Sequence, residues 1–192
     1  MWPRFLAMLA AMSQPAHPMR TLHILWGAIL SSTVMIFGAS FVVEAQPSKE
    51  LALLLPAFGF LGLNMAVLSF WLPPKTAVHA LQRVVIPTRE IDDPMSLPGS
   101  GRTVKVPTDP ASAHRTVLQL LQPPLILRLA LGESVALFGF VLHVMGAPVP
   151  HILPFFVVCW VLHFIAFPSD KAMLAFAQKH TGVRLDLVTP AR

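Results

Sequence analysis

The sequence predicts an all-α integral membrane protein, in which four transmembrane helices form a bundle of two hairpins. Three observations lead to this prediction. Charged residues make up only 12% of the chain, against about 25% in an ordinary globular protein. Four apolar stretches reach or approach the length of about 20 residues that a helix needs to cross a bilayer. The basic residues lie between these stretches rather than in one run, as is typical of membrane proteins.

Two short turns and one long connection separate the four stretches. The first two carry no charged side chain, whereas the third contains Arg128 and Glu133, and the fourth ends before Pro168. Tight turns at residues 45–50 and 146–150 predict that consecutive spans pair as hairpins. The chain therefore divides into an N-terminal segment, a first hairpin, a proline-rich loop, a second hairpin and a tail, with expected boundaries at residues 1–20, 21–72, 73–122, 123–168 and 169–192.

The positive-inside rule orients the spans. Nearly all Lys and Arg residues outside the spans precede the first, lie between the second and third, or follow the fourth, and Lys49 alone lies on the opposite side. We therefore expect a multi-pass protein of the bacterial inner membrane, with both termini and the long loop in the cytoplasm. Trp26 and Trp71 fall at the cytoplasmic ends of their spans, where interfacial aromatic residues are enriched.

The N-terminal segment has features of a short signal peptide, with Arg4 before about eight apolar residues. That apolar run is at the low end for such a peptide. We favour an uncleaved segment or a misassigned start, with translation beginning at Met12 or Met19, over secretion.

The long connection is expected to contain short amphipathic helices that lie on the membrane surface. Residues 75–85 form one candidate, and residues 86–107 are expected to be irregular because PGSG stands at their middle. Asp109 and Pro110 predict the start of a second surface helix, which the proline pair at 123–124 turns into the membrane.

The tail is expected to form one more surface helix. Ser169 stands where a cap would start it, and Gly182 where it would end. Its apolar residues, Met173, Leu174 and Phe176, would contact the membrane surface.

Helices in lipid associate through close backbone approach and interhelical hydrogen bonds, because lipid tails are as apolar as leucine. Asn64 lies mid-span and is expected to hydrogen-bond to another helix. Small residues mark the expected contact faces, either within one chain or against a copy or another subunit. These residues are Gly27, Ser31, Gly38, Gly59, Gly62, Ala66, Gly132, Ala136 and Gly139.

Glu133 is the most informative polar residue, since an ionisable side chain inside a span costs about 2.5–3.5 kcal/mol. We expect it to be protonated or paired. Counting residues from the turn at 146–150 places His163 at a similar depth, so a Glu133–His163 hydrogen bond is predicted if their faces meet. The same count predicts a structural ion pair between Arg128 and Asp170 near the cytoplasmic interface. Glu133 has three open roles: a structural hydrogen-bonded carboxyl, a proton- or ion-binding carboxyl, or a catalytic group.

Composition and spacing argue against most site chemistries. Cys159 is the only cysteine, so an intramolecular disulfide and a thiolate metal cluster are excluded. His143 and His163 differ in depth by about 12 Å, too far for one haem iron to join them. The chain has no dinucleotide fingerprint, P-loop or nucleophile elbow, and no aromatic residues interleave with the basic ones. We therefore expect no catalytic residue, no cofactor, no metal site and no nucleic-acid partner.

Two resemblances follow from the third span. The segment ALGESVALFGFVL, residues 130–142, resembles the carboxylate-bearing helix of rotary ATP synthase c subunits, which implies reversible protonation of Glu133. More broadly, the chain is similar to small uncharacterised four-span bacterial membrane proteins. Those have an RxLxIxWGAxL-like first helix, here residues 20–30, and an IxRxALxExxALFG-like third helix, here residues 126–139. This resemblance implies the four-span architecture and transfers no catalytic residue.

The leading functional hypothesis is a non-enzymatic accessory or structural protein that contacts the bilayer, other membrane proteins or itself. The rival is a proton- or ion-handling protein in which Glu133, His163 and Asn64 line a polar path. A membrane enzyme acting on lipids is a third class. It would use polar residues of the cytoplasmic rim, whose spacing is not that of metal ligands: His79, Glu90, Asp92, Asp93 and His114.

Overall fold

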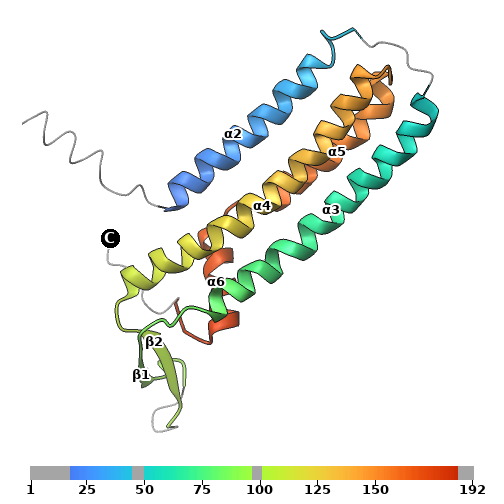
Figure 1. Ribbon diagram of the computed structural model, residues 1–192. Coiled ribbons are helices and arrows are strands. Elements are labelled where there is room, and N and C mark those ends of the chain that lie inside the picture. The colour runs from blue at the N-terminus through green and yellow to red at the C-terminus, as the bar shows by residue number, and fades with distance from the viewer. Residues whose placement is uncertain (1–17, 45–49, 97–100, 186–192) are drawn as a thin grey trace, which may run out of the picture.

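The computed structural model describes residues 18–44, 50–96 and 101–185 (Figure 1). The signal-like segment, most of the first turn and most of the PGSG sequence lie outside these ranges. The described chain is mainly helical, with one small antiparallel sheet. Its elements are α2 (Pro18–Ala39), α3 (Leu51–Gln82), β1 (Thr88–Asp92), β2 (Thr103–Pro107), α4 (Pro110–Val144), α5 (Val149–Ile165) and α6 (Asp170–Thr181).

Three of these helices, α2, α3 and α4, are long and apolar enough to cross a membrane. α5 has 17 residues, which is about 26 Å of helix. α5 is long and apolar enough to count as a membrane span only when it is taken together with α6, and the two helices are bent by 70° relative to each other. The expected all-α architecture with membrane-spanning helices is therefore confirmed, with three spans among the described residues, or four when the bent pair counts as one.

α4 is the central helix of the membrane part (Figure 1). α5 folds back along it after a tight turn at Gly146, which has a φ of +104°. α2 and α3 pack mainly on α4 rather than on each other. The predicted hairpin of residues 21–72 is therefore not confirmed, because the main partner of each of its helices is α4.

α3 and α4 continue through the proline pairs that were expected to end or redirect them. Pro73 and Pro74 lie inside α3, and Pro123 and Pro124 lie inside α4. The helices have 32 and 35 residues, so they are about 48 and 53 Å long and exceed a hydrocarbon core of about 30 Å. The predictions of a separate helix at 75–85 and of a surface helix ending before Pro123 are wrong.

A small apolar core outside the spans explains why the prolines do not break these helices. The projecting ends of α3 and α4 pack against α6, and the burial of a Leu or Val side chain contributes about 1.5–3 kcal/mol. That burial offsets helix hydrogen bonds lost at the prolines, which cost about 3 kcal/mol each. The buried members are Ala77, Leu81, Ala113, Val117, Leu121, Ala177, Val183 and Leu185.

The predicted starts of α4 and α6 are confirmed, but a side-chain capping hydrogen bond is present at α4 and not at α6. Asp109 accepts hydrogen bonds from the backbone N–H groups of Ala111 and Ser112, at 3.1 and 3.2 Å, and so starts α4. Ser169 precedes α6, and Gly182 ends it in the left-handed conformation at φ +70°. α6 nevertheless packs its apolar side on α3 and α4 instead of lying alone on a membrane surface.

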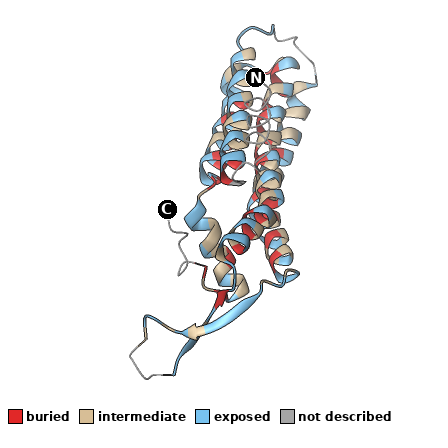
Figure 2. Cartoon of the chain, turned by 90° about the vertical axis from the view of Figure 1, so that its left-hand side faces the viewer, coloured by how far each residue is buried: buried red, intermediate tan, exposed pale blue. Residues whose placement is uncertain are grey.

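The segment predicted to be irregular contains a β-hairpin that extends away from the helices (Figures 1 and 2). β1 and β2 are antiparallel, with Thr88 opposite Pro107 and Asp92 opposite Thr103. Glu90 stands opposite Lys105, and such an opposite-charge pair favours pairing. Sequence inspection missed these strands because each has only five residues.

We predict that Gly139→Ala destabilises the protein by about 1–3 kcal/mol, the usual cost of overpacking a filled site. A Cβ at this position would lie 2.8 Å from the Cβ of Phe155 on α5. Gly38→Ala is the matched control, since a Cβ there meets nothing within 4 Å and alanine favours helix by about 1 kcal/mol. The free energy of unfolding of both variants is measured in mixed micelles. Equal changes in this free energy for the two substitutions would contradict the close approach of α4 and α5.

Candidate functional site

Glu133 of α4 is half-buried and binds the neighbouring helix α2. Its Oε1 atom accepts a hydrogen bond from the Ser32 hydroxyl at 2.6 Å. The same hydroxyl also lies 2.8 Å from the carbonyl oxygen of Ile29 in its own helix. The carboxyl group therefore has a donor within the membrane part, and its contact ties α4 to α2.

His163 is fully buried between α5 and α4. Its Nδ1 atom lies 2.8 Å from the carbonyl oxygen of Cys159. A carbonyl oxygen only accepts, so Nδ1 carries the proton and donates it. The ring also lies against α4, because a Cβ at Gly132 would be 3.3 Å from the Cε1 atom of His163.

The predicted hydrogen bond between Glu133 and His163 is not among the contacts of the described residues. The two residues do come to the same level, because the His163 ring covers Gly132, the residue before Glu133. Glu133 bonds to Ser32 instead, while the Nε2 atom of His163 is buried without a hydrogen-bond partner. The helix rise predicted the similar depth of Glu133 and His163 correctly. The rotation of α4 about its own axis, however, directs the Glu133 carboxyl group toward α2.

Further polar contacts around this level were missed by sequence inspection. The indole Nε1 of Trp26 donates to the carbonyl oxygen of His163 at 2.9 Å, which ties α2 to α5. Thr33 is fully buried, and its hydroxyl lies 4.0 Å from the Sγ atom of Cys159. Three hydroxyl residues in a row at 31–33 were the available signal, since successive polar side chains inside a span require partners.

Asn64 does not join this cluster. It lies on α3, is exposed, and donates from Nδ2 to the carbonyl oxygen of Phe60 in its own helix at 2.7 Å. The structure therefore places Glu133 and His163 at the same depth without a hydrogen bond between them, and leaves Asn64 on a different helix, facing outward.

Arg128 and Asp170 form no ion pair in the part of the chain that the structure describes. The Arg128 guanidinium lies over the ring of Phe70, with Cζ 5.2 Å from the ring centroid, and its Nε atom is buried without a hydrogen-bond partner. Asp170 is exposed in the first turn of α6. The 70° bend between α5 and α6 directs this turn away from the axis of α5, which the residue count had extended straight.

His143 lies near the end of α4, at the opposite end of the bundle from Arg128. The two ring nitrogens of His143 lie 2.9 Å from the carbonyl oxygen of Ala147 and 3.3 Å from that of Val43. His151 is exposed at the start of α5. Among the described residues, no group of three His, Cys, Asp or Glu side chains has the arrangement of a metal site.

Fold and site together define an α-helical membrane protein in which polar side chains join α2 to α4 and α2 to α5. No protein-family profile, curated protein or solved structure matches the chain. The resemblances seen in the third span therefore stay predictions, and the functional argument rests on this chain's own geometry.

We predict that Ser32→Ala lowers the free energy of unfolding by about 0.5–1.7 kcal/mol, the range found for interhelical hydrogen bonds in membranes. The loss follows from removing the donor to Glu133. Ser31→Ala is the matched control, because Ser31 is exposed on the same helix. Unfolding titrations in mixed micelles measure both variants, and a loss of equal size in the control would refute the assignment.

Proposed function

We propose that this chain is a non-enzymatic structural protein of the membrane that associates with a second copy of itself through the outer face of α3. The observation that supports this proposal is the exposed amide of Asn64 near the middle of the apolar part of α3. A polar side chain at that depth is stabilised when it reaches a hydrogen-bonding partner on another helix.

The residues around Asn64 have the spacing of a helix-packing seam. Six exposed positions follow one another at alternating intervals of four and three residues, which is the heptad pattern of paired helices. We call them the α3 seam: Leu53 (76% exposed), Ala57, Phe60 (68%), Asn64, Val67 (58%) and Trp71 (57%).

A two-fold axis along the membrane normal would place the α3 seams of two copies face to face. Both Asn64 residues then lie at the same depth, where each amide both donates to and accepts from the other. A single asparagine in such a seam sets the register and number of paired helices. Self-association is favoured over a different partner because this seam is self-complementary.

We place the protein in the bacterial inner membrane, with both termini and the β-hairpin in the cytoplasm. The distribution of basic residues supports this orientation. Arg20, Lys75, Arg115 and Lys171 are exposed beside the ends of the spans that would face the cytoplasm.

Cysteine crosslinking in native membranes tests the α3 seam. We expect Phe60→Cys and Val67→Cys to give a disulfide-linked dimer on mild oxidation, because each residue would meet its copy across the axis. The native Cys159 is buried and stays in place. Leu61→Cys is the matched control: it is 41% exposed but lies at least about 100° around the helix from Phe60 and from Val67.

Adding Asn64→Leu to the Val67→Cys variant is expected to lower the dimer yield about fivefold, which corresponds to the loss of about 1 kcal/mol. Dimers of equal yield from Leu61→Cys, or a monomer in every variant, would overturn the proposal.

The rival function, proton or ion handling at Glu133, is supported by one contact. His163 lies beside the backbone next to Glu133, and its Nε2 atom is buried without a hydrogen-bond partner among the described residues. An intramembrane carboxyl near an imidazole is a common arrangement in proton relays.

Purified protein in liposomes that contain a pH-sensitive dye tests this rival. If it holds, the wild type conducts protons and Glu133→Gln abolishes the flux, while the Gln side chain still accepts the Ser32 hydrogen bond. Ser134→Ala is the control, since the hydroxyl of Ser134 donates to the carbonyl oxygen of Ala130 in its own helix. A wild type without flux excludes the rival.

A further inference from the structure

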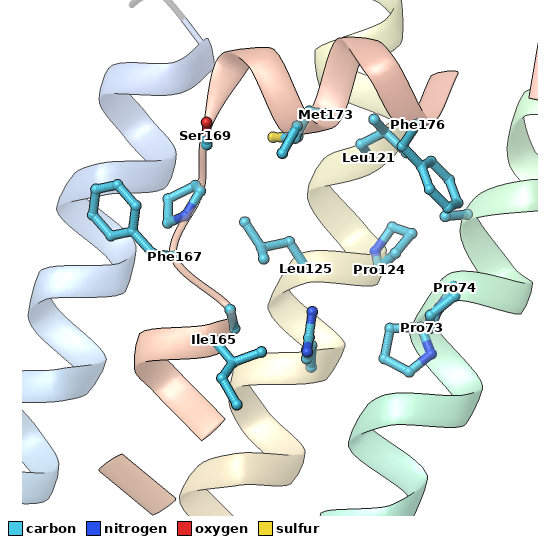
Figure 3. Close-up of a pocket in the computed structure, with 15 residues that line it drawn as sticks. Pro73, Pro74, Leu121, Pro124, Leu125, Ile165, Phe167, Ser169, Met173 and Phe176 are labelled. Atoms are coloured by element: carbon cyan, nitrogen blue, oxygen red, sulfur yellow. The ribbon is translucent and has the colours of Figure 1, made fainter. Parts of the chain in front are cut away.

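A pocket of about 240 Å³ lies between α3, α4 and the break that separates α5 from α6 (Figure 3). Its walls are mostly apolar. Figure 3 shows Pro73 and Pro74 on one side, Leu125 and Pro124 along α4, and Met173 over the end that α6 covers. The rim formed by Ile165 and Phe167 is exposed, at 53% and 50%, so the pocket is open to its surroundings.

Arg128 is the one cationic side chain in the lining of this pocket. Its guanidinium has neither a carboxylate nor a hydrogen-bond partner among the described residues, and its buried Nε is unsatisfied. A half-buried cation without an anion is costly, and a guanidinium binds carboxylate or phosphate groups through a fork of N–H donors. The pocket therefore favours an anion at Arg128.

The depth of Arg128 identifies what surrounds the pocket. Arg128 lies 16 residues before Val144, the last residue of α4, which is about 24 Å of helix. In a hydrocarbon core of about 30 Å, Arg128 is therefore near the boundary on the side of α6. Phosphate groups of lipids lie at this boundary, and their acyl chains extend toward the bundle.

Ser169 adds a hydroxyl group to the polar side of the pocket. It precedes α6 but makes no side-chain capping hydrogen bond. Its hydroxyl is thus available to an acceptor that reaches Arg128. The first turn of α6 also lines the pocket through Ala172, and the start of a helix favours negative charge.

We propose that this pocket binds one anionic phospholipid, with the phosphate at Arg128 and part of an acyl chain against the prolines and Leu125. A free inorganic anion would use only the guanidinium, whereas the lipid uses both the charge and the apolar walls. This inference is independent of the α3 seam, because no seam residue lines the pocket and no second copy is involved.

Lipid titration of the purified full-length protein in detergent, followed by native mass spectrometry, tests the proposal. Phosphatidylglycerol and phosphatidylcholine with identical acyl chains are the probes, and inorganic phosphate is added as competitor. We expect the wild type to bind one phosphatidylglycerol at least tenfold more tightly than phosphatidylcholine. Phosphate at millimolar concentration is expected not to displace it.

Two variants address the site and one controls for charge. Arg128→Gln is expected to remove the preference for phosphatidylglycerol, a loss of about tenfold to hundredfold, as for hydrogen bonds to a charged group. Ala172→Phe fills the pocket while keeping Arg128, so it is expected to abolish lipid binding at the same charge. Arg115→Gln removes an exposed cation of α4 that does not line the pocket, and is expected to bind as the wild type does.

The proposal is overturned if Arg128→Gln and Ala172→Phe both retain the wild-type preference. It is equally overturned if phosphatidylcholine binds as tightly as phosphatidylglycerol, or if inorganic phosphate displaces the lipid, since the site would then recognise an anion alone. Circular dichroism of each variant identifies misfolding, and a well-folded Ala172→Phe variant decides the question even if Arg128→Gln does not fold.

Discussion

The close approach of α5 to α4 is the contact on which the membrane part of this protein depends. Lipid provides no hydrophobic force between helices, so association requires near contact of their backbones. Gly132 and Gly139 provide it: a Cβ at either position would come within 3.3 Å or less of a side-chain atom of His163 or Phe155. The same approach buries His163, whose carbonyl oxygen then holds Trp26 and with it α2.

The polar side chains of α4 divide into two levels with different surroundings. At the inner level, Glu133 has its donor in Ser32, so its most direct role is to join two helices. At the level near the boundary, Arg128 lines a pocket and has no anionic partner in the described chain. The first level joins α2 to α4, whereas the second holds a guanidinium that lies over the ring of Phe70 and has no anionic partner among the described residues.

Sequence reasoning succeeded where a signal was local. Apolar length predicted α2, α3 and α4, and Asp109 predicted the start of α4 because its carboxylate bonds to N–H groups two and three residues later. Sequence reasoning failed at Pro123 and at Pro73, where the rule that proline ends a helix predicts helix boundaries that the structure does not have. Packing among α3, α4 and α6 outweighs that rule, and no single segment contains this information.

The amino-acid sequence by itself determined the membrane class, the positions of the apolar stretches and the similar depth of Glu133 and His163, because these depend on composition and helix rise. Only the tertiary structure decided that Glu133 faces Ser32, that Asn64 faces outward and that Arg128 lines a pocket. The physical reason is rotation: the direction of a side chain around its helix depends on which neighbours pack against that helix, and these lie far away in the chain.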